Sequence, residues 1–483
     1  MPADILVPEQ SESIVSVPLI DMAESDMYAQ AALFEEQTEH NTSVKPPIII
    51  DQQQDQKTPE VWITVFVHGI MSIKPHLTWE NFFRFMNDRV LNSVYSKSVE
   101  LMREDEHFYW SQAMQGMGLQ HLDPTDLRAT KAGNAIARIY DEVSHILDPH
   151  EENYYYTFGW SGLLSPTQRY YDAQEFFLAL EELVQTFKKE GKNPRVRVIG
   201  YSHGGNVALN LGAVRQRVYP DSSLSIDELF LLGVPILTET DYLVCDPLFK
   251  KIYNFTSPHD RIQQIDFFSF NRVLSRKYLT GRRKFSVPDK VRQVSLKFMQ
   301  SVPTKKYDIC NRSRARSKTC DGSIISGNNR LLRNVSPGHI ELWFFGWSPQ
   351  HYRHDFILCP LPVLAVLPYL QKILDRVQHK FTNPYRIIMD IRPEDGLVII
   401  KQHKPCRVLH IEKFLSCGQL QKLADIAHTV IPISYTEPEF NAHIVAAQKR
   451  AIEFYDASEK YVKKATCISK WQVRMRMRHL IRP

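Results

Sequence analysis

Residues 200–204 read Gly-Tyr-Ser-His-Gly, which places a serine between two glycines and a histidine directly after it. A serine hydroxyl is a weak nucleophile unless it is exposed beside a general base. Gly200 and Gly204 suit a tight turn that lifts the hydroxyl off a sheet edge, because side chains there would clash with neighbouring chain. The motif follows a strand-like run and precedes a helix-like run, which is the setting that a nucleophile turn requires. Ser202 is therefore the predicted nucleophile.

A second motif lies upstream, where His68-Gly69 ends an almost continuous run of β-branched and aromatic residues. Acyl transfer develops negative charge on a carbonyl oxygen, and two preorganised backbone N–H groups can stabilise it. One of these groups is expected from His203, the residue after the nucleophile. We assign the other to Ile70, with Met71 as the neighbouring alternative.

Together these motifs resemble those of the α/β-hydrolase superfamily, and within it the lipases and serine esterases with a His-Gly-x oxyanion loop. The resemblance covers residues 60–380. It implies a Ser…Asp/Glu…His triad in that chain order, and it implies neither a metal nor an organic cofactor. A weaker similarity, which rests on no specific motif, is to lipase-like effectors that intracellular bacteria deliver into host cells.

The family's acid usually follows the second strand after the nucleophile's strand. Here that strand is predicted at 252–255, and Asp260 comes 58 residues after Ser202. Pro258 favours a turn that would direct the Asp260 carboxylate back toward the nucleophile. A triad needs such a carboxylate to orient the histidine and to stabilise the imidazolium. The alternative acids are Glu239, Asp241 and Asp266.

Family members carry the base on a loop after the last strand, and His339 follows a Pro-Gly turn at such a place. We assign His339 as the base on this ground. Three other histidines remain alternatives: His259, His351 and His354.

Strand-like and helix-like segments alternate through this region, which predicts a doubly wound, mostly parallel α/β sheet. The predicted strands are 61–67, 154–158, 196–199, 229–232, 252–255 and 291–298. Helices are expected from Ser165 to Gly191, from Ser202 to about 218, and over 362–377. Beyond 381, a hairpin is predicted around Gly396, followed by helices over 412–428 and 437–464.

Three parts are expected along the chain. Residues 1–58 form an acidic, largely disordered leader, 59–380 the α/β-hydrolase domain, and 381–483 a C-terminal α+β extension with a basic tail. The hydrolase domain carries a large helical, lid-like insertion over 72–152 and a basic insertion over 301–335. The lid-like insertion is rich in aromatic residues near Trp79, which would suit a lipid acyl chain.

Charge is distributed unevenly. The 483 residues carry a net charge of +5, but residues 1–60 hold twelve acids against two lysines and so carry −10. Residues 61–483 therefore carry +15, with basic clusters at 301–335 and 460–483. These clusters favour contact with an anionic membrane surface, whereas the modest total argues against a nucleic-acid partner.

The compartment is predicted from the termini and the cysteines. The N-terminus lacks the basic and apolar regions of a classical signal peptide, and the seven cysteines form no Cys-x-x-Cys pair. We expect a chain that is cytoplasmic or exported without a classical signal peptide, with peripheral membrane association as a further hypothesis.

The function predicted from these residues is a serine hydrolase that cleaves carboxylic esters, with a lipid or phospholipid as the expected substrate. Two alternatives stay open. One is an acyltransferase that uses the same triad. The other is a binding or scaffold protein on a hydrolase fold whose site is weak or inactive.

Overall fold

The computed structural model describes residues 60–70, 88, 90–128, 131–262, 275–282, 285–303, 324–325, 330–348, 352–377, 386–402, 407–431, 436 and 438–456. The chain divides into two units, and the first comprises Met1–Lys57 with Ile325–Arg330. The second comprises Thr58–Ile324 with Leu331–Pro483. The predicted acidic leader, the basic tail at 460–483 and most of the basic insertion lie outside the described residues.

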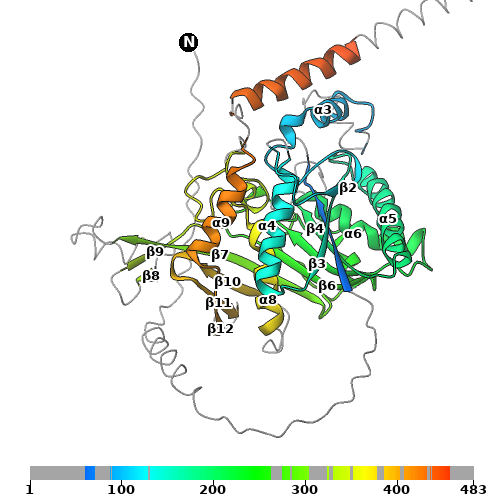
Figure 1. Cartoon of the computed structure of the whole chain (residues 1–483). Coiled ribbons are helices and arrows are strands. Elements are labelled where there is room, and N and C mark those ends of the chain that lie inside the picture. The colour runs from blue at the N-terminus through cyan, green and yellow to red at the C-terminus, as the bar shows by residue number, and fades with distance from the viewer. Residues whose placement is uncertain are drawn as a thin grey trace, which may run out of the picture. The chain divides into compact units, whose positions relative to one another are not determined.

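One mixed sheet organises the described part of the second unit (Figure 1). Its strands run in the order β12-β11-β10-β7-β6-β5-β4-β1-β3-β2. Their bounds are β1 (Glu60–Val67), β2 (Gly118–Leu122), β3 (Glu152–Gly159), β4 (Asn193–Tyr201), β5 (Ile226–Leu232), β6 (Phe249–Thr256), β7 (Val291–Pro303), β10 (Ile387–Arg392), β11 (Leu397–Gln402) and β12 (Arg407–Lys413). Off this path lie β8 (Ile324–Ile325) and β9 (Arg330–Asn334), and β9 pairs with β7.

All neighbours from β3 to β10 are parallel, whereas β2, β11 and β12 add antiparallel edges. The prediction of a mostly parallel α/β sheet is thereby confirmed. In β1, Val65 belongs to one apolar core and Phe66 to the other, because successive side chains of a strand point to opposite faces. The near-continuous apolar sequence of this strand reflects burial on both sides.

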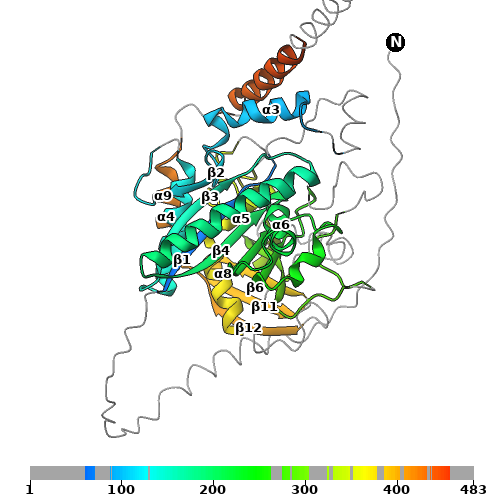
Figure 2. The same cartoon turned by 90° about the vertical axis from the view of Figure 1, so that its right-hand side faces the viewer.

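Helices cover both faces of the sheet (Figure 2). The helices α5 (Pro166–Lys189) and α6 (His203–Arg217) pack on the face that includes Val65. On the other face lie α4 (Ala132–Leu147), α8 (Val363–Val377) and α9 (Cys417–His428). The fold is therefore doubly wound, as the alternation of strands and helices predicts.

The longest of these helices, α5, shows why the predicted segments form. Ser165 is its N-cap and accepts a hydrogen bond from Gln168 N at 2.9 Å, while Pro166 occupies the first turn. The stripe that includes Phe176 and Leu180 is buried against the sheet. After the C-cap, Gly191 adopts φ +77°, a conformation that glycine reaches at little cost.

The predicted insertion over 72–152 contains helices and a strand in its described residues. It includes α3 (Val94–Arg103), the short 3₁₀ helix η1 (Glu106–Phe108) and α4, but also β2, which pairs antiparallel with β3. Part of this segment thus extends the sheet. The aromatic run near Trp79 lies outside the described residues.

The segment after 381, which the sequence sets apart as an α+β extension, also adds to the main sheet. The strands β10 and β11 form the predicted hairpin, with Gly396 at φ +63° in the turn. Parallel pairing of β10 with β7 then joins this hairpin to the sheet. The helix predicted from 412 begins only at Cys417, because residues 407–413 form β12 and Ser416 caps the helix.

Residues 438–456 form a further helix. Among the described residues, no helix combines the length and the apolar character needed to cross a membrane.

The cap of α5 can be tested by Ser165→Ala. Removing the hydroxyl leaves the Gln168 N–H without its capping partner, so the free energy of unfolding should fall by about 1 kcal/mol. Urea denaturation followed by circular dichroism measures this. Thr186→Ala, at an exposed position inside the same helix, is the control and should change stability by less than about 0.5 kcal/mol. An equal effect of the two variants would contradict the capping role.

Candidate active site

Ser202 occupies the sharp turn between β4 and α6. Its backbone lies at φ 50° and ψ −131°, in the left-handed half of conformational space that non-glycine residues rarely adopt. Two hydrogen bonds hold the turn: Ser202 N donates to Leu232 O, and Gly205 N donates to Ser202 O, each at 3.0 Å. Although Ser202 is the N-cap of α6, its side chain does not cap the helix. The hydroxyl is therefore available to other groups.

The glycines around Ser202 are required by close packing of the backbone. A Cβ on Gly200 would lie 2.5 Å from Gly205 Cα, and one on Gly204 would lie 2.2 Å from His68 O. Real Cβ atoms do not approach backbone atoms so closely. The backbone of the turn therefore packs closely against α6 and against the loop after β1.

Ser202, His339 and Asp260 form a continuous chain of hydrogen bonds. Ser202 Oγ lies 3.0 Å from His339 Nε2, and His339 Nδ1 lies 2.8 Å from Asp260 Oδ2. With the histidine neutral and its proton on Nδ1, the serine hydroxyl donates to Nε2 and Nδ1–H donates to the carboxylate. The exposed fractions are 4% for Ser202, 8% for His339 and 0% for Asp260, so bulk water is largely excluded.

These three side chains come from the ends of different elements. Ser202 follows β4, Asp260 follows β6, and His339 precedes the 3₁₀ helix η6 (Ile340–Leu342) after β9. Parallel strands carry their carboxyl ends to one edge of a sheet, and loops after these strands meet there. The parallel strand order therefore explains how Ser202 and Asp260, 58 positions apart along the chain, meet. His339 follows closely on Val335, whose N–H donates to Phe298 O of β7 at 2.8 Å.

Tyr201 and Trp343 hold His339 in place. Tyr201 Oη donates to His339 O at 3.1 Å, and the Tyr201 ring centroid lies 4.9 Å from that of the imidazole. The Trp343 ring stacks on Tyr201 with centroids 5.1 Å apart. Both aromatic side chains are buried, so the imidazole is supported by a rigid apolar wall.

The predicted oxyanion loop is ordered by Trp160. His68 Nδ1 lies 2.6 Å from Gly69 O and its Nε2 lies 3.3 Å from Trp160 N, while Trp160 Nε1 donates to His68 O at 2.7 Å. Burial, with a smaller effect of Arg103, lowers the pKa of His68 well below its usual value. A neutral imidazole matches this pattern, because it donates through Nδ1 and accepts at Nε2.

The two predicted N–H donors, His203 and Ile70, come from the turn at Ser202 and from the loop after β1. His203 is the first residue of α6, and the half-buried Ile70 follows Gly69 in the loop after β1. A Cβ on Gly69 would lie 3.1 Å from Ser202 Cβ, which shows how closely this loop approaches the serine. Met71, the alternative donor, lies outside the described residues.

One buried contact beside Ser202 could not be recognised from the sequence. Arg169 of α5 is 4% exposed, and its Nη1 lies 3.4 Å from His203 Nδ1. Burial, together with Arg169 and His339, lowers the pKa of His203 well below its usual value, so the neutral ring can accept from the guanidinium. The sequence feature that could have indicated this contact is the position of Arg169, four residues before Ala173 and therefore on the apolar stripe of α5.

The alternative acids and bases have other partners or positions. Glu239 pairs with Arg169 at 3.6 Å, and the buried Asp241 pairs with two arginines, Arg276 and Arg282. His259 Nδ1 lies 3.0 Å from Ser336 O, and His354 is exposed. Asp266 and His351 lie outside the described residues.

Comparisons with known proteins add little to this geometry. No protein-family model matches the chain, and no curated relative matches it. A solved structure described as a "putative cell surface hydrolase" from Lactobacillus plantarum is similar over 49% of this chain and 79% of that one. The identity is 12% and the TM-score 0.21. The sheet order itself is compatible with an α/β-hydrolase fold.

Gly233 offers a sharp test of the His339–Asp260 contact. It has φ +63°, and an added Cβ would lie 3.2 Å from Asp260 Oδ2, 3.4 Å from His339 Nδ1 and 2.7 Å from Leu342 Cδ1. Gly233→Ala should therefore displace the acid–base pair and lower the reactivity of Ser202 toward a fluorophosphonate at least about tenfold.

The matched control is Gly396→Ala. Gly396 has the same φ of +63°, but an added Cβ would meet nothing within 4 Å. Both variants should lose about 1 kcal/mol of stability from the backbone strain, while only Gly233→Ala should lose reactivity. Equal labelling of the two folded variants would show that Gly233 does not shape the pair.

Proposed function

We propose that this protein is a serine hydrolase that cleaves carboxylic esters through an acyl-enzyme. The observation that carries the proposal is the pair of hydrogen bonds from Ser202 through His339 to Asp260. A serine on a strained turn, a buried imidazole and a buried carboxylate in this order form the arrangement that activates a hydroxyl.

The proposed reaction begins when Ser202 Oγ attacks the ester carbonyl and His339 Nε2 takes its proton. The backbone N–H groups of Ile70 and His203 would stabilise the oxyanion, and Asp260 the imidazolium. His339 then returns the proton to the leaving alcohol, which departs. Water, deprotonated by His339, attacks the acyl-enzyme and releases the carboxylic acid and Ser202.

The position of the oxyanion loop supports this sequence of steps. Gly69 approaches Ser202. Trp160 holds His68 through two hydrogen bonds, one to its backbone carbonyl and one to its imidazole. Donors that are already oriented need no reorganisation when charge develops, and this is where such sites gain most of their effect.

The proposed substrate class is a lipid or phospholipid ester. It rests on the aromatic composition of the lid-like insertion in the sequence, near Trp79. Contact with an anionic membrane through the basic segments would bring the enzyme to such a substrate.

Active-site labelling tests the proposed reaction. A fluorophosphonate probe should label the wild type, and Ser202→Ala should abolish labelling and lower ester hydrolysis by about 10³-fold or more, because the nucleophile is lost. His339→Ala should have a comparable effect, since the base is lost. The control is His354→Ala, at an exposed position, which should retain wild-type labelling.

The outcomes separate the competing functions. A folded wild type that never labels would favour a binding or scaffold role. Ser202→Ala that labels as well as the wild type would exclude Ser202 as the nucleophile. Labelling with slow hydrolysis but fast transfer to an added alcohol would identify an acyltransferase instead.

The substrate class can be tested with p-nitrophenyl esters of increasing acyl length and with phospholipid vesicles. If the acyl site is apolar, each added methylene should strengthen binding by about 0.8 kcal/mol until the site is filled. kcat/KM should therefore rise from acetate to the longer esters. A steady fall along this series, with no release of fatty acid from vesicles, would contradict a lipid substrate while leaving ester hydrolysis intact.

A further inference from the structure

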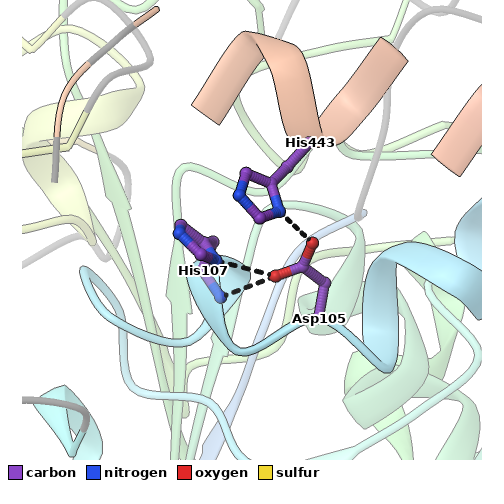
Figure 3. A group of neighbouring side chains, drawn as sticks. All are labelled: Asp105, His107 and His443. Carbon is purple, nitrogen blue, oxygen red and sulfur yellow. Dashed lines mark hydrogen bonds and ion pairs between the residues drawn. The ribbon is translucent and has the colours of Figure 1, made fainter. Parts of the chain in front are cut away.

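Three side chains that can bind metal ions meet outside the proposed active site (Figure 3). Asp105 and His107 lie at the short helix η1, just after α3, and His443 lies on helix 438–456. The two segments are 338 residues apart in the chain, measured from Asp105 to His443. Each of the three residues offers one ligand atom, and these atoms all lie within 4.8 Å of one another. Among the described residues, this is the group of His, Cys, Asp or Glu side chains that meets this spacing.

Both imidazoles turn Nδ1 toward the same carboxylate. His107 Nδ1 lies 2.9 Å from Asp105 Oδ1, and His443 Nδ1 forms a short hydrogen bond with Asp105 Oδ2. The two rings are stacked with centroids 3.6 Å apart. Asp105 is itself held, because its Oδ1 accepts from His107 N at 3.1 Å and so caps η1. The two imidazole nitrogens thus face the two oxygens of one carboxylate.

We propose that Asp105, His107 and His443 bind a Zn²⁺ ion, which fastens helix 438–456 to the segment that follows α3. Zinc takes imidazole and carboxylate ligands at about 2.0–2.2 Å in tetrahedral geometry, which places ligand atoms about 3.3 Å apart. The ligand atoms of the three residues lie within 4.8 Å of one another, and the stacked rings turn on binding to bring their lone pairs onto the ion. The imidazole protons move from Nδ1 to Nε2 through solvent, so that the Nδ1 lone pairs face the ion.

The fourth ligand is water, because the cluster is open on one side. The side chains of His107, Asp105 and His443 are 21%, 15% and 36% exposed. An ion can therefore enter from solvent, and a water molecule can complete the tetrahedron. The Trp110 ring packs against the His107 ring, with centroids 4.2 Å apart.

A small apolar contact explains why the ion would matter to this helix. Phe440 packs against Phe108 with ring centroids 4.8 Å apart, and Ala447 joins the same cluster. Phe440, His443 and Ala447 follow helical spacing, so they share one face. Because this cluster is small compared with the two main cores, a metal link would add substantially to the attachment.

The proposed zinc site is independent of the proposed hydrolase function. Its test therefore uses metal-binding and hydrogen-exchange measurements rather than activity. The full-length chain is prepared without a histidine tag and stripped of metal. Zn²⁺ binding is measured by isothermal titration calorimetry near pH 7.5. Co²⁺ then replaces Zn²⁺, because its visible absorption reports tetrahedral coordination.

The variants are His443→Gln, His107→Gln and the control His145→Gln. His145 also lies near a carboxylate, Asp141, at 3.5 Å on α4, but it is not in the three-ligand group. The wild type and the control should bind one equivalent of Zn²⁺ with the same affinity. Each ligand variant should lose affinity at least about tenfold, with circular dichroism showing that the fold is kept.

Hydrogen exchange gives the second readout. Zn²⁺ should slow amide exchange in residues 438–456 in the wild type and in His145→Gln, but not in His443→Gln. The proposal is overturned if the folded wild type binds no Zn²⁺, or if His443→Gln binds it as tightly as the wild type. It is also overturned if Zn²⁺ leaves exchange in this helix unchanged, and in that case hydrogen bonds alone explain the cluster.

Discussion

The close approach of two backbone segments is the constraint on which the rest of the site depends. The turn at Ser202 lies so near the loop after β1 that Gly204 leaves no space for a side chain beside His68 O. The turn at Ser202 and the loop after β1 therefore form one packed unit, and neither can shift alone. Trp160 extends this unit to β3 through its hydrogen bonds with His68. The strained φ of Ser202 persists because the surrounding backbone over-determines it.

Much of this arrangement could be predicted because the relevant signals are local. Val196 to Ile199 and the glycines after them mark a buried strand and a tight turn within a few residues, and a parallel sheet brings strand ends together. The assignments of Asp260 and His339 needed the family resemblance as well, since nothing near them in the sequence shows that they meet. The structure places them 2.8 Å apart, Nδ1 to Oδ2.

Features that depend on distant partners left no comparable signal. The strands β2 and β12 lie at the sheet edges, and their short sequences are half polar, so periodicity alone does not separate them from loops. In the sequence, Arg169 is a charged residue on an apolar stripe, and its partner is not apparent there. The structure shows that His203 lies beside it. The contact between Asp105 and His443 spans 338 residues and becomes visible only in three dimensions.

The pairing of β10 with β7 has a consequence for the integrity of the chain. Ending the protein at residue 380 would leave β7 with a row of unpaired N–H and C=O groups. It would also remove Ile387, Met389 and Ile391, which are buried in the core on one face of the sheet. Such an open, apolar edge is a template for intermolecular strand addition. Residues 387–391 therefore protect the edge of β7 from such pairing, and the segment after 381 is an integral part of the sheet.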